Sequence, residues 1–271
     1  EKINQVSLEQ ACQMLMQHHD VLRSRYYEAY GAWQQDCLSV AAMLEETQSI
    51  SLCELRQLHG NQQAIQQQIV EISAECQASL HLDNRLIRVI LFDVGNDAPQ
   101  QLLIVIHHLM LDGVSWRILL DDLRTVYRQI EQNQAISLPL KTHSYNAWAL
   151  ELNQYAKSPE LLSQLPYWLK HSAYSSGKLP TDSESLVAAM NSVTVELNQG
   201  ATRQLLQKVP KAYRTQINDV LLFALVKTLN IWTKDRAFII NLEGHGRESQ
   251  IRENIDLSRT VGWFTSVFPV F

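Results

Sequence analysis

The amino-acid sequence predicts a protein of the α/β class, on three observations. An unbroken apolar run at 102–106 stops at two histidines, which is typical of a buried central strand. A polar turn follows, and the apolar positions after it, from 114 to 127, recur at helical spacing. A second strand-like run at 237–242 also ends in a polar cluster. The 271 residues are enough for one large domain or two of medium size.

Composition and charge exclude several classes of function. Hydrophobic residues make up 46% of the chain, so we expect a buried core. The net charge of -5 provides no basic surface for nucleic acid and does not favour an anionic membrane. No apolar stretch approaches the roughly 20 residues of a membrane span. We therefore expect no nucleic-acid partner and no membrane partner.

The cysteines and the chain ends bear on the compartment. The cysteines are Cys12, Cys37, Cys53 and Cys76. They show no CxxC spacing, so neither a zinc site nor a disulfide framework is expected, and a reducing, cytoplasmic setting fits. The first residues do not form a signal peptide and lack a starting Met, and the last residues fall inside an expected strand. We expect a piece of a longer protein.

The first third of the chain shows alternating helix and strand signals. Ser7 and Gln10 have the spacing of a capping box, with Ser7 as N-cap. The apolar face of this helix contains Leu8, Cys12, Leu15 and Met16. Residues 23–27 favour a strand, whereas 34–50 fit neither period. A helix is expected at 61–80, with Ile65, Ile69, Ile72 and Cys76 on one face.

The remaining elements follow the same rules. Two strands at 86–94 and 101–107 flank a turn at 95–97, which predicts a hairpin. Further helices are expected at 144–156, 159–171, 200–208 and 218–232. The last of these is apolar enough to be buried. Further strands are expected at 192–197, 237–242 and 261–268. Residues 171–182 are rich in Ser, Gly and Pro and form the best linker candidate.

The first ionisable cluster follows the central strand. His107 and His108 are followed by Asp112 and Gly113, all within seven residues, and Gly113 would permit backbone angles that other residues resist. Sites in α/β proteins tend to lie at strand ends. The alternative is a pair of hydrogen-bonded histidines that close a buried strand. The density of ionisable groups favours chemistry over that alternative.

The second cluster occupies 243–248. It combines two glycines, two carboxylates, a histidine and an arginine. Alone, it could equally be a solvated turn whose surface ion pair contributes little. A carboxylate that faces an imidazole across a substrate is a workable general acid–base pair. We therefore expect the strands at 102–107 and 237–242 to end at one cleft between two halves of the chain.

Other chemistries lack their signatures. Adjacent histidines on a strand point to opposite faces, and no HExxH spacing is present, so no metal site is expected. There is no GxSxG nucleophile motif and no glycine loop that would cradle phosphate. A metal enzyme, a serine hydrolase and a nucleotide-binding enzyme are all disfavoured.

Several stretches resemble one known family. Residues 107–113 (HHLMLDG) resemble the HHxxxDG motif of the condensation superfamily of nonribosomal peptide synthetases. Residues 18–23 (HHDVLR) look like its HHDxLR segment. Four stretches are similar to the epimerisation form of that superfamily: 114–119 (VSWRIL), 213–222 (YRTQINDVLL), 243–248 (EGHGRE) and 259–265 (RTVGWFT). The resemblance extends from residue 18 to residue 265.

The resemblance implies a fold. Such domains consist of two chloramphenicol-acetyltransferase-like subdomains, each a mixed sheet covered by helices, which face each other across a cleft. It implies an N-terminal subdomain at 1–178, which carries HHxxxDG, and the start of a C-terminal subdomain at 179–271, which carries EGHGRE. Relative to the family, the chain is truncated at both ends.

The resemblance also implies an activity. Epimerisation domains are isomerases of antibiotic biosynthesis that invert the α-carbon of an aminoacyl or peptidyl thioester from L to D. The substrate arrives on the 4'-phosphopantetheine of a peptidyl carrier protein, and the domain has no cofactor of its own. The expected partners are that carrier and neighbouring adenylation and condensation domains.

The resemblance assigns roles to individual residues. His108 and Glu243 would carry the two protons. Asp112 would be structural and paired with an arginine, for which the candidates are Arg23, Arg247 and Arg259. His107 and Gly113 would support the loop, and Trp116 and Trp263 would pack.

Two alternatives use the same superfamily. A condensation domain would form amide bonds with HHxxxDG, but it has no need of the acid–base group in EGHGRE. A non-catalytic recruitment module would usually have a degraded HHxxxDG, whereas both histidines, Asp112 and Gly113 are intact here.

Overall fold

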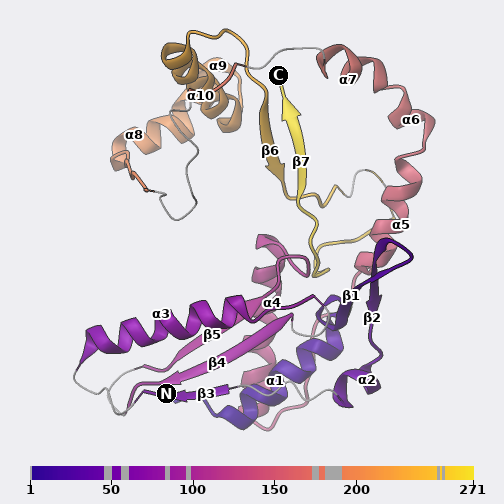
Figure 1. The fold of residues 1–271 in the computed structure, drawn as a ribbon, viewed down its shortest axis with the longest axis vertical. Coiled ribbons are helices and arrows are strands. Elements are labelled where there is room, and N and C mark those ends of the chain that lie inside the picture. The colour runs from indigo at the N-terminus through magenta and orange to yellow at the C-terminus, as the bar shows by residue number, and fades with distance from the viewer. Residues whose placement is uncertain are drawn as a thin grey trace. The chain divides into compact units, whose positions relative to one another are not determined.

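The chain forms two compact units in the computed structural model (Figure 1). The described residues are 2–45, 51–55, 61–82, 86–95, 99–172, 177–180, 191–248, 251 and 254–271. The first unit comprises Glu1–Ser158 and Gly244–Ser266, and the second comprises Pro159–Glu243 and Val267–Phe271. The subdomain limit expected at 178 lies inside the second unit. The chain returns to the first unit at Gly244, so most of the second ionisable cluster shares a unit with the first.

A mixed three-stranded sheet forms the centre of the first unit. Its strands are β3 (Ser51–Glu54), β4 (Ile87–Asp93) and β5 (Gln101–Ile106), in the order β3-β4-β5. β3 runs parallel to β4, and β4 pairs antiparallel with β5 from Ile87↔Ile106 to Phe92↔Gln101. The predicted hairpin is confirmed, although Asn96 and Asp97 of its turn lie outside the described residues. The mixed sheet with its helices confirms the α/β class.

Helices cover both faces of this sheet (Figure 1). On one face, α1 (Gln5–His18) and α4 (Gly113–Glu131) pack against each other and against the side chains of Val89 and Ile104. On the other face, α3 (Gln62–Ala78) packs on Ile90 and Phe92. Because alternate residues of a strand point to opposite faces, a strand covered on both sides needs an unbroken apolar run. This is why 102–106 contains no polar residue.

The first helix begins earlier than the capping pattern predicts. Asn4, not Ser7, is the N-cap, and its side chain accepts hydrogen bonds from the N–H groups of Val6 and Ser7. Ser7 is 7% exposed and donates its hydroxyl to Glu131 of α4. The predicted apolar face is confirmed, since Leu8, Leu15 and Met16 are buried. The predicted helix at 61–80 is likewise confirmed as α3, with Asn61 as its cap.

A hairpin and a short helix occupy the stretch that fits neither period. A 3-10 turn, Asp20–Arg23, leads into β1 (Ser24–Ala29), which pairs with β2 (Ala32–Cys37). The turn residues Tyr30 and Gly31 have φ values of 56° and 73°, the left-handed geometry that matches the twist of a tight hairpin. α2 (Val40–Glu45) follows.

The rest of the chain is mainly helical. The helices are α5 (Tyr145–Tyr155), α6 (Pro159–Leu162), α7 (Leu165–Ser172), α8 (Gln199–Arg203), α9 (Val209–Tyr213) and α10 (Ile217–Thr233), with a π-helical turn, Gln204–Lys208, between α8 and α9. β6 (Ile240–Gly244) and β7 (Ser266–Val270) form a two-stranded sheet. Both strands begin three to five residues later than expected.

Two predictions for the second unit are wrong. Residues 191–198 form no strand, and Val193 and Val195 are 88% and 87% exposed. α10 is present but not buried, since Phe223 and Trp232 remain 67% and 58% exposed and the helix has no buried residue. An apolar pattern states which side chains need cover, but a neighbouring element has to supply it. Of the expected linker, only 171–172 and 177–180 are described, and 177–180 have no regular structure.

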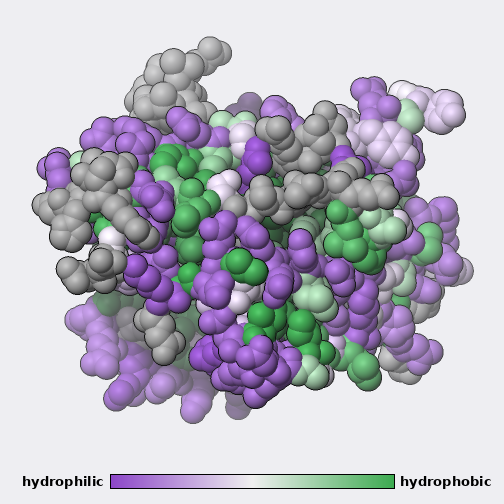
Figure 2. All heavy atoms as spheres, turned by 90° about the horizontal axis from the view of Figure 1, so that it is seen from below, coloured by the Kyte–Doolittle hydropathy of each residue, from purple (hydrophilic) through white to green (hydrophobic). Residues whose placement is uncertain are grey.

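The surface combines hydrophilic and hydrophobic side chains, and Figure 2 shows both kinds interspersed on one face. Among the helices of the described residues, none has the length and the apolar character that crossing a membrane requires.

Candidate active site

The loop that carries the first cluster leaves the sheet at the end of β5. The N–H of His107 still donates to the carbonyl of Leu86 at 2.8 Å, which extends the ladder by one bond beyond Ile106. The N–H of Leu109 then donates to Nδ1 of His107 at 3.2 Å. His107 therefore makes its contacts within the loop itself. Neither histidine lies inside the strand, so the expected alternation of the pair across the sheet does not apply.

His108 has a defined ring orientation. Its Nδ1 lies 2.9 Å from the carbonyl oxygen of Leu111. A carbonyl can only accept, so Nδ1 carries the proton of the neutral ring, and Nε2 is left with a lone pair. The imidazole is exposed and lies 5.6 Å from the indole of Trp263, with 30° between the ring planes. This arrangement presents an unprotonated ring nitrogen at an accessible surface.

Buried neighbours anchor the loop below His108. The hydroxyl of Tyr26 donates to the carbonyl of Leu109 at 3.0 Å. Burial raises the pKa of Tyr26 to about 12, so the hydroxyl keeps its proton for this bond. Met110 and Leu111 are 1% and 2% exposed and belong to the main core. The loop is thus held by packing as well as by hydrogen bonds.

Asp112 closes the loop as the N-cap of α4. One carboxylate oxygen accepts the N–H of Ser115 at 2.7 Å, and the other accepts the N–H of Phe264 at 3.1 Å. Gly113 is the first residue of the helix, and its φ is not positive. The space around its Cα is open. The expectation that Gly113 supplies an unusual backbone angle is therefore wrong for this conformation.

Arg247 is the arginine that pairs with Asp112. Its Nη2 lies 3.4 Å from Oδ1 of Asp112, and the two side chains are 10% and 4% exposed. Its Nη1 donates to the carbonyls of Leu257 and Thr260 at 3.0 and 2.7 Å. The guanidinium also stacks on the ring of Phe264, 3.9 Å from the ring centre. Of the three arginines expected as candidates, this one spans the two ionisable clusters.

The other two arginines have different partners. Arg23 donates to Asp20 and to the carbonyl of Met16, at the end of α1. Arg259 pairs with Asp122 of α4. Both arginines therefore secure the helices around the loop and not the loop itself.

The carboxyl group of Asp112 is held ionised. Burial by itself raises the pKa of this group. The hydrogen bonds from Ser115 and Phe264, together with the charge of Arg247, outweigh burial and hold the pKa of Asp112 below its usual range. Asp112 is therefore suited to fix the loop and not to carry protons near neutral pH.

Ser115 and Gly246 are structural residues whose importance the motifs did not single out. Ser115 is 0% exposed and contacts both Arg247 and the backbone of Gly262. Gly246 has a φ of 65°, and a Cβ there would lie 1.5 Å from the carbonyl oxygen of Phe264. The second glycine of EGHGRE is therefore required sterically. The sequence signals were faint: a serine three residues after an N-cap aspartate, and a glycine inside a motif.

Glu243 belongs to the second unit. It lies in β6, directly before the chain returns to the first unit at Gly244, and its side chain is exposed. The cleft expected between His108 and Glu243 stays a prediction.

A second cluster of ionisable groups lies at the end of α1. His19 bonds to one oxygen of Asp122 at 2.9 Å, while Arg259 pairs with the other oxygen. The nitrogens of His18 and His19 and an oxygen of Asp122 lie within 4.8 Å of one another, a spacing that a metal ion could use. Because both oxygens of Asp122 already have partners, we interpret this cluster as an ion-pair network that joins α1, α4 and the segment before Trp263.

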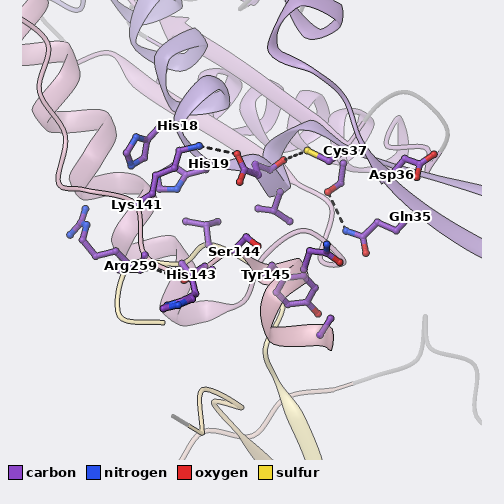
Figure 3. A pocket seen from close by; sticks show the side chains of 18 residues that line it. His18, His19, Gln35, Asp36, Cys37, Lys141, His143, Ser144, Tyr145 and Arg259 are labelled. Carbon is purple, nitrogen blue, oxygen red and sulfur yellow. Dashed lines mark hydrogen bonds and ion pairs between the residues drawn. The ribbon is translucent and has the colours of Figure 1, made fainter. Parts of the chain in front are cut away.

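A pocket of about 470 Å³ lies beside that network (Figure 3). His18, Lys141, His143 and Arg259 line it together with Ser144 and Tyr145 at the start of α5. Burial is the main cause that lowers the pKa of His18, and the nearby His19, Lys141 and Arg259 add to it against Asp122. His108 is not among the lining residues. The sequence did not indicate this pocket, because its residues come from separate segments.

Comparison with known proteins places the chain in a family. The family model described as "Condensation domain" matches residues 1–271. A protein of the linear gramicidin synthase of Brevibacillus parabrevis is 45% identical over 274 residues, which cover 100% of this chain and 5% of that protein. The chain therefore spans a small part of this relative.

Solved structures agree with this family. The epimerization domain from the third module of a tyrocidine synthetase has a TM-score of 0.84 and 36% identity, covering 100% of this chain and 59% of that one. The first condensation domain of the calcium-dependent antibiotic synthetase has a TM-score of 0.71 at 18% identity, covering 99% and 61%. The latter likeness concerns the fold alone. From these matches and the loop geometry, the chain belongs to the condensation-domain family.

Proposed function

We propose that this chain is the epimerising member of its family: it inverts the α-carbon of an aminoacyl or peptidyl thioester, L to D. The observation that supports this most is the 36% identity to an epimerization domain over the whole chain, against 18% for a condensation domain. The motif at 243–248, EGHGRE, points in the same direction. The coarser assignment to the condensation superfamily does not depend on this proposal.

The mechanism needs one proton carrier on each face of the α-carbon. A thioester acidifies its α-proton, and removal of that proton leaves an enolate whose charge rests on the thioester oxygen. A proton delivered to the opposite face gives the inverted product, and the reaction is reversible. We assign His108 and Glu243 to the two faces. Each group would contribute about 10²–10⁴-fold to the rate.

The contacts around His108 support its role. Nδ1 is occupied by the Leu111 carbonyl, so Nε2 can accept a proton from the substrate without a change of tautomer. The resulting imidazolium would be stabilised by the same hydrogen bond. Asp112 and Arg247 hold the loop in place and take no part in proton transfer.

The substrate would arrive on a carrier protein. We propose that the thioester is borne on the 4'-phosphopantetheine arm of a peptidyl carrier and that adenylation and condensation domains are neighbours of this chain. The relatives are named as synthases of peptides such as linear gramicidin, and the chain spans only 5% of the linear gramicidin synthase protein that it matches. Production of a D-residue for a peptide of this class is the purpose we infer.

Proton exchange tests the proposal. The full-length protein is incubated in deuterated water with a carrier loaded with an L-aminoacyl or L-peptidyl thioester. A D/L mixture should form, and the mass should rise by one deuteron. His108→Ala and Glu243→Gln should each lower the rate of inversion by about 10²-fold or more. Glu248→Gln and His143→Ala are matched controls that should keep the wild-type rate.

Each outcome discriminates between the alternatives. Equal rates in His108→Ala, Glu243→Gln and the wild type would show that the residues are wrongly assigned. Formation of a peptide from two loaded carriers would identify a condensation domain. A wild-type protein that binds a carrier without either reaction would be a recruitment module.

A further inference from the structure

We infer that Ser115 is a positioning residue for His108 and that it acts through the backbone of Gly262 and the indole of Trp263. The kinetic part of this inference rests on the proposed function. The structural part does not, because it concerns only contacts inside the first unit.

The hydroxyl of Ser115 is fully used. Its Oγ donates to the carbonyl of Gly262 at 2.8 Å and accepts the N–H of Gly262 at 3.1 Å and Nη2 of Arg247 at 2.8 Å. A serine hydroxyl has one donor and two acceptor positions, so every position is filled. Because Ser115 is 0% exposed, no bulk water can replace it. One side chain thus satisfies both backbone polar groups of Gly262.

The next two residues are held in the same way. The carbonyl of Trp263 accepts the hydroxyl of Tyr145 at 2.8 Å, and the N–H of Phe264 donates to Asp112. The main chain on both sides of Trp263 is therefore tied to the first unit. This leaves its indole, 37% exposed, with a set direction against the imidazole of His108. Trp263 is thus more than the packing residue expected from the sequence.

His108 is restrained from two directions as a result. The bond from Nδ1 to Leu111 limits rotation of the ring, and the indole of Trp263 bounds one side of it. Proton transfer depends steeply on the position of the accepting atom, and a displacement of about 1 Å can cost about 10²-fold in rate. Loss of the Ser115 hydroxyl would leave buried groups of Gly262 unpaired, so that segment would move and release Trp263.

The kinetic test compares two buried serines in the full-length protein. Ser115→Ala should lower kcat for inversion by about 10–100-fold and change KM by less than about threefold. Ser7→Ala is the matched control, because Ser7 is 7% exposed and bonds to Glu131, away from the loop. It should leave both constants near the wild-type values. Tyr145→Phe loosens Trp263 without emptying buried space and serves if Ser115→Ala fails to fold.

A double-mutant cycle tests the route through Trp263. If Ser115 acts through that residue, Ser115→Ala should have little further effect on kcat in a Trp263→Ala background. Independent, additive effects of the two substitutions would overturn the proposed route.

A chemical probe gives a readout without turnover. Diethyl pyrocarbonate modifies accessible imidazole nitrogens, and peptide mass spectrometry reports the rate at His108, with His143 as internal reference. Ser115→Ala should raise the rate at His108 several-fold, and Ser7→Ala should not. A change in reactivity with no epimerisation in the wild type would refute the proposed function alone. Wild-type reactivity and kcat in both Ser115→Ala and Tyr145→Phe would refute the positioning role.

Discussion

The two units bury their own side chains to very different degrees. In the first, a three-stranded sheet has helices on both faces and two separate clusters of buried residues. In the described part of the second, Phe238 alone among the hydrophobic residues is buried, and the apolar helix α10 has no buried residue. His108 therefore belongs to a closely packed scaffold, whereas Glu243 is on an exposed strand. Precision at the candidate site originates in the first unit.

Two tryptophans should show this difference most clearly. Trp148 of α5 is 2% exposed and packs with Leu257 and Phe264, while Trp232 of α10 is 58% exposed. Trp148→Ala should lower the free energy of unfolding by about 3–5 kcal/mol, because a buried aromatic side chain leaves a cavity. Trp232→Ala should cost less than about 1 kcal/mol. Urea titration followed by circular dichroism measures both, and equal losses would refute the contrast between the units.

Two glycines should show the same kind of difference within the site. A Cβ at Gly246 would overlap the carbonyl of Phe264, and the residue has a positive φ, whereas Gly113 is open and begins a helix. Gly246→Ala should cost about 2–4 kcal/mol through strain and overlap. Gly113→Ala should change stability by less than about 1 kcal/mol. Thermal unfolding of the two variants would decide, and a harmless Gly246→Ala would contradict the close packing of the two clusters.

The pH dependence of stability should give the smallest effect. The pKa of Asp112 is lower in the folded protein than its usual value, so the unfolded chain takes up the proton first as pH falls. The stabilisation by Asp112 is therefore fully present above the ordinary carboxyl pKa of about 4 and is lost as pH falls through the folded value. Asp112→Asn should unfold with a shallower pH slope below about pH 4. An unchanged slope would indicate that Asp112 is not held ionised.

Local patterns in the sequence were sufficient for most elements of the first unit. The hairpin of β4 and β5 and the helices α1, α3 and α4 were all predictable, because each side chain that needs burial recurs with the period of its element. The same signals were wrong at 191–198 and for the burial of α10. At those places the pattern is present, but the covering element is absent among the described residues.

By itself, the sequence determined the α/β class, the two ionisable clusters and the family that they resemble. Only the tertiary structure decided that Arg247, and not Arg23 or Arg259, pairs with Asp112. It also decided that Ser115 holds Gly262 and that Gly246 cannot carry a side chain. The physical reason is distance along the chain: these contacts join residues 132 to 152 positions apart. A periodic pattern records which face of an element is buried, but it carries no record of which distant residue meets that face.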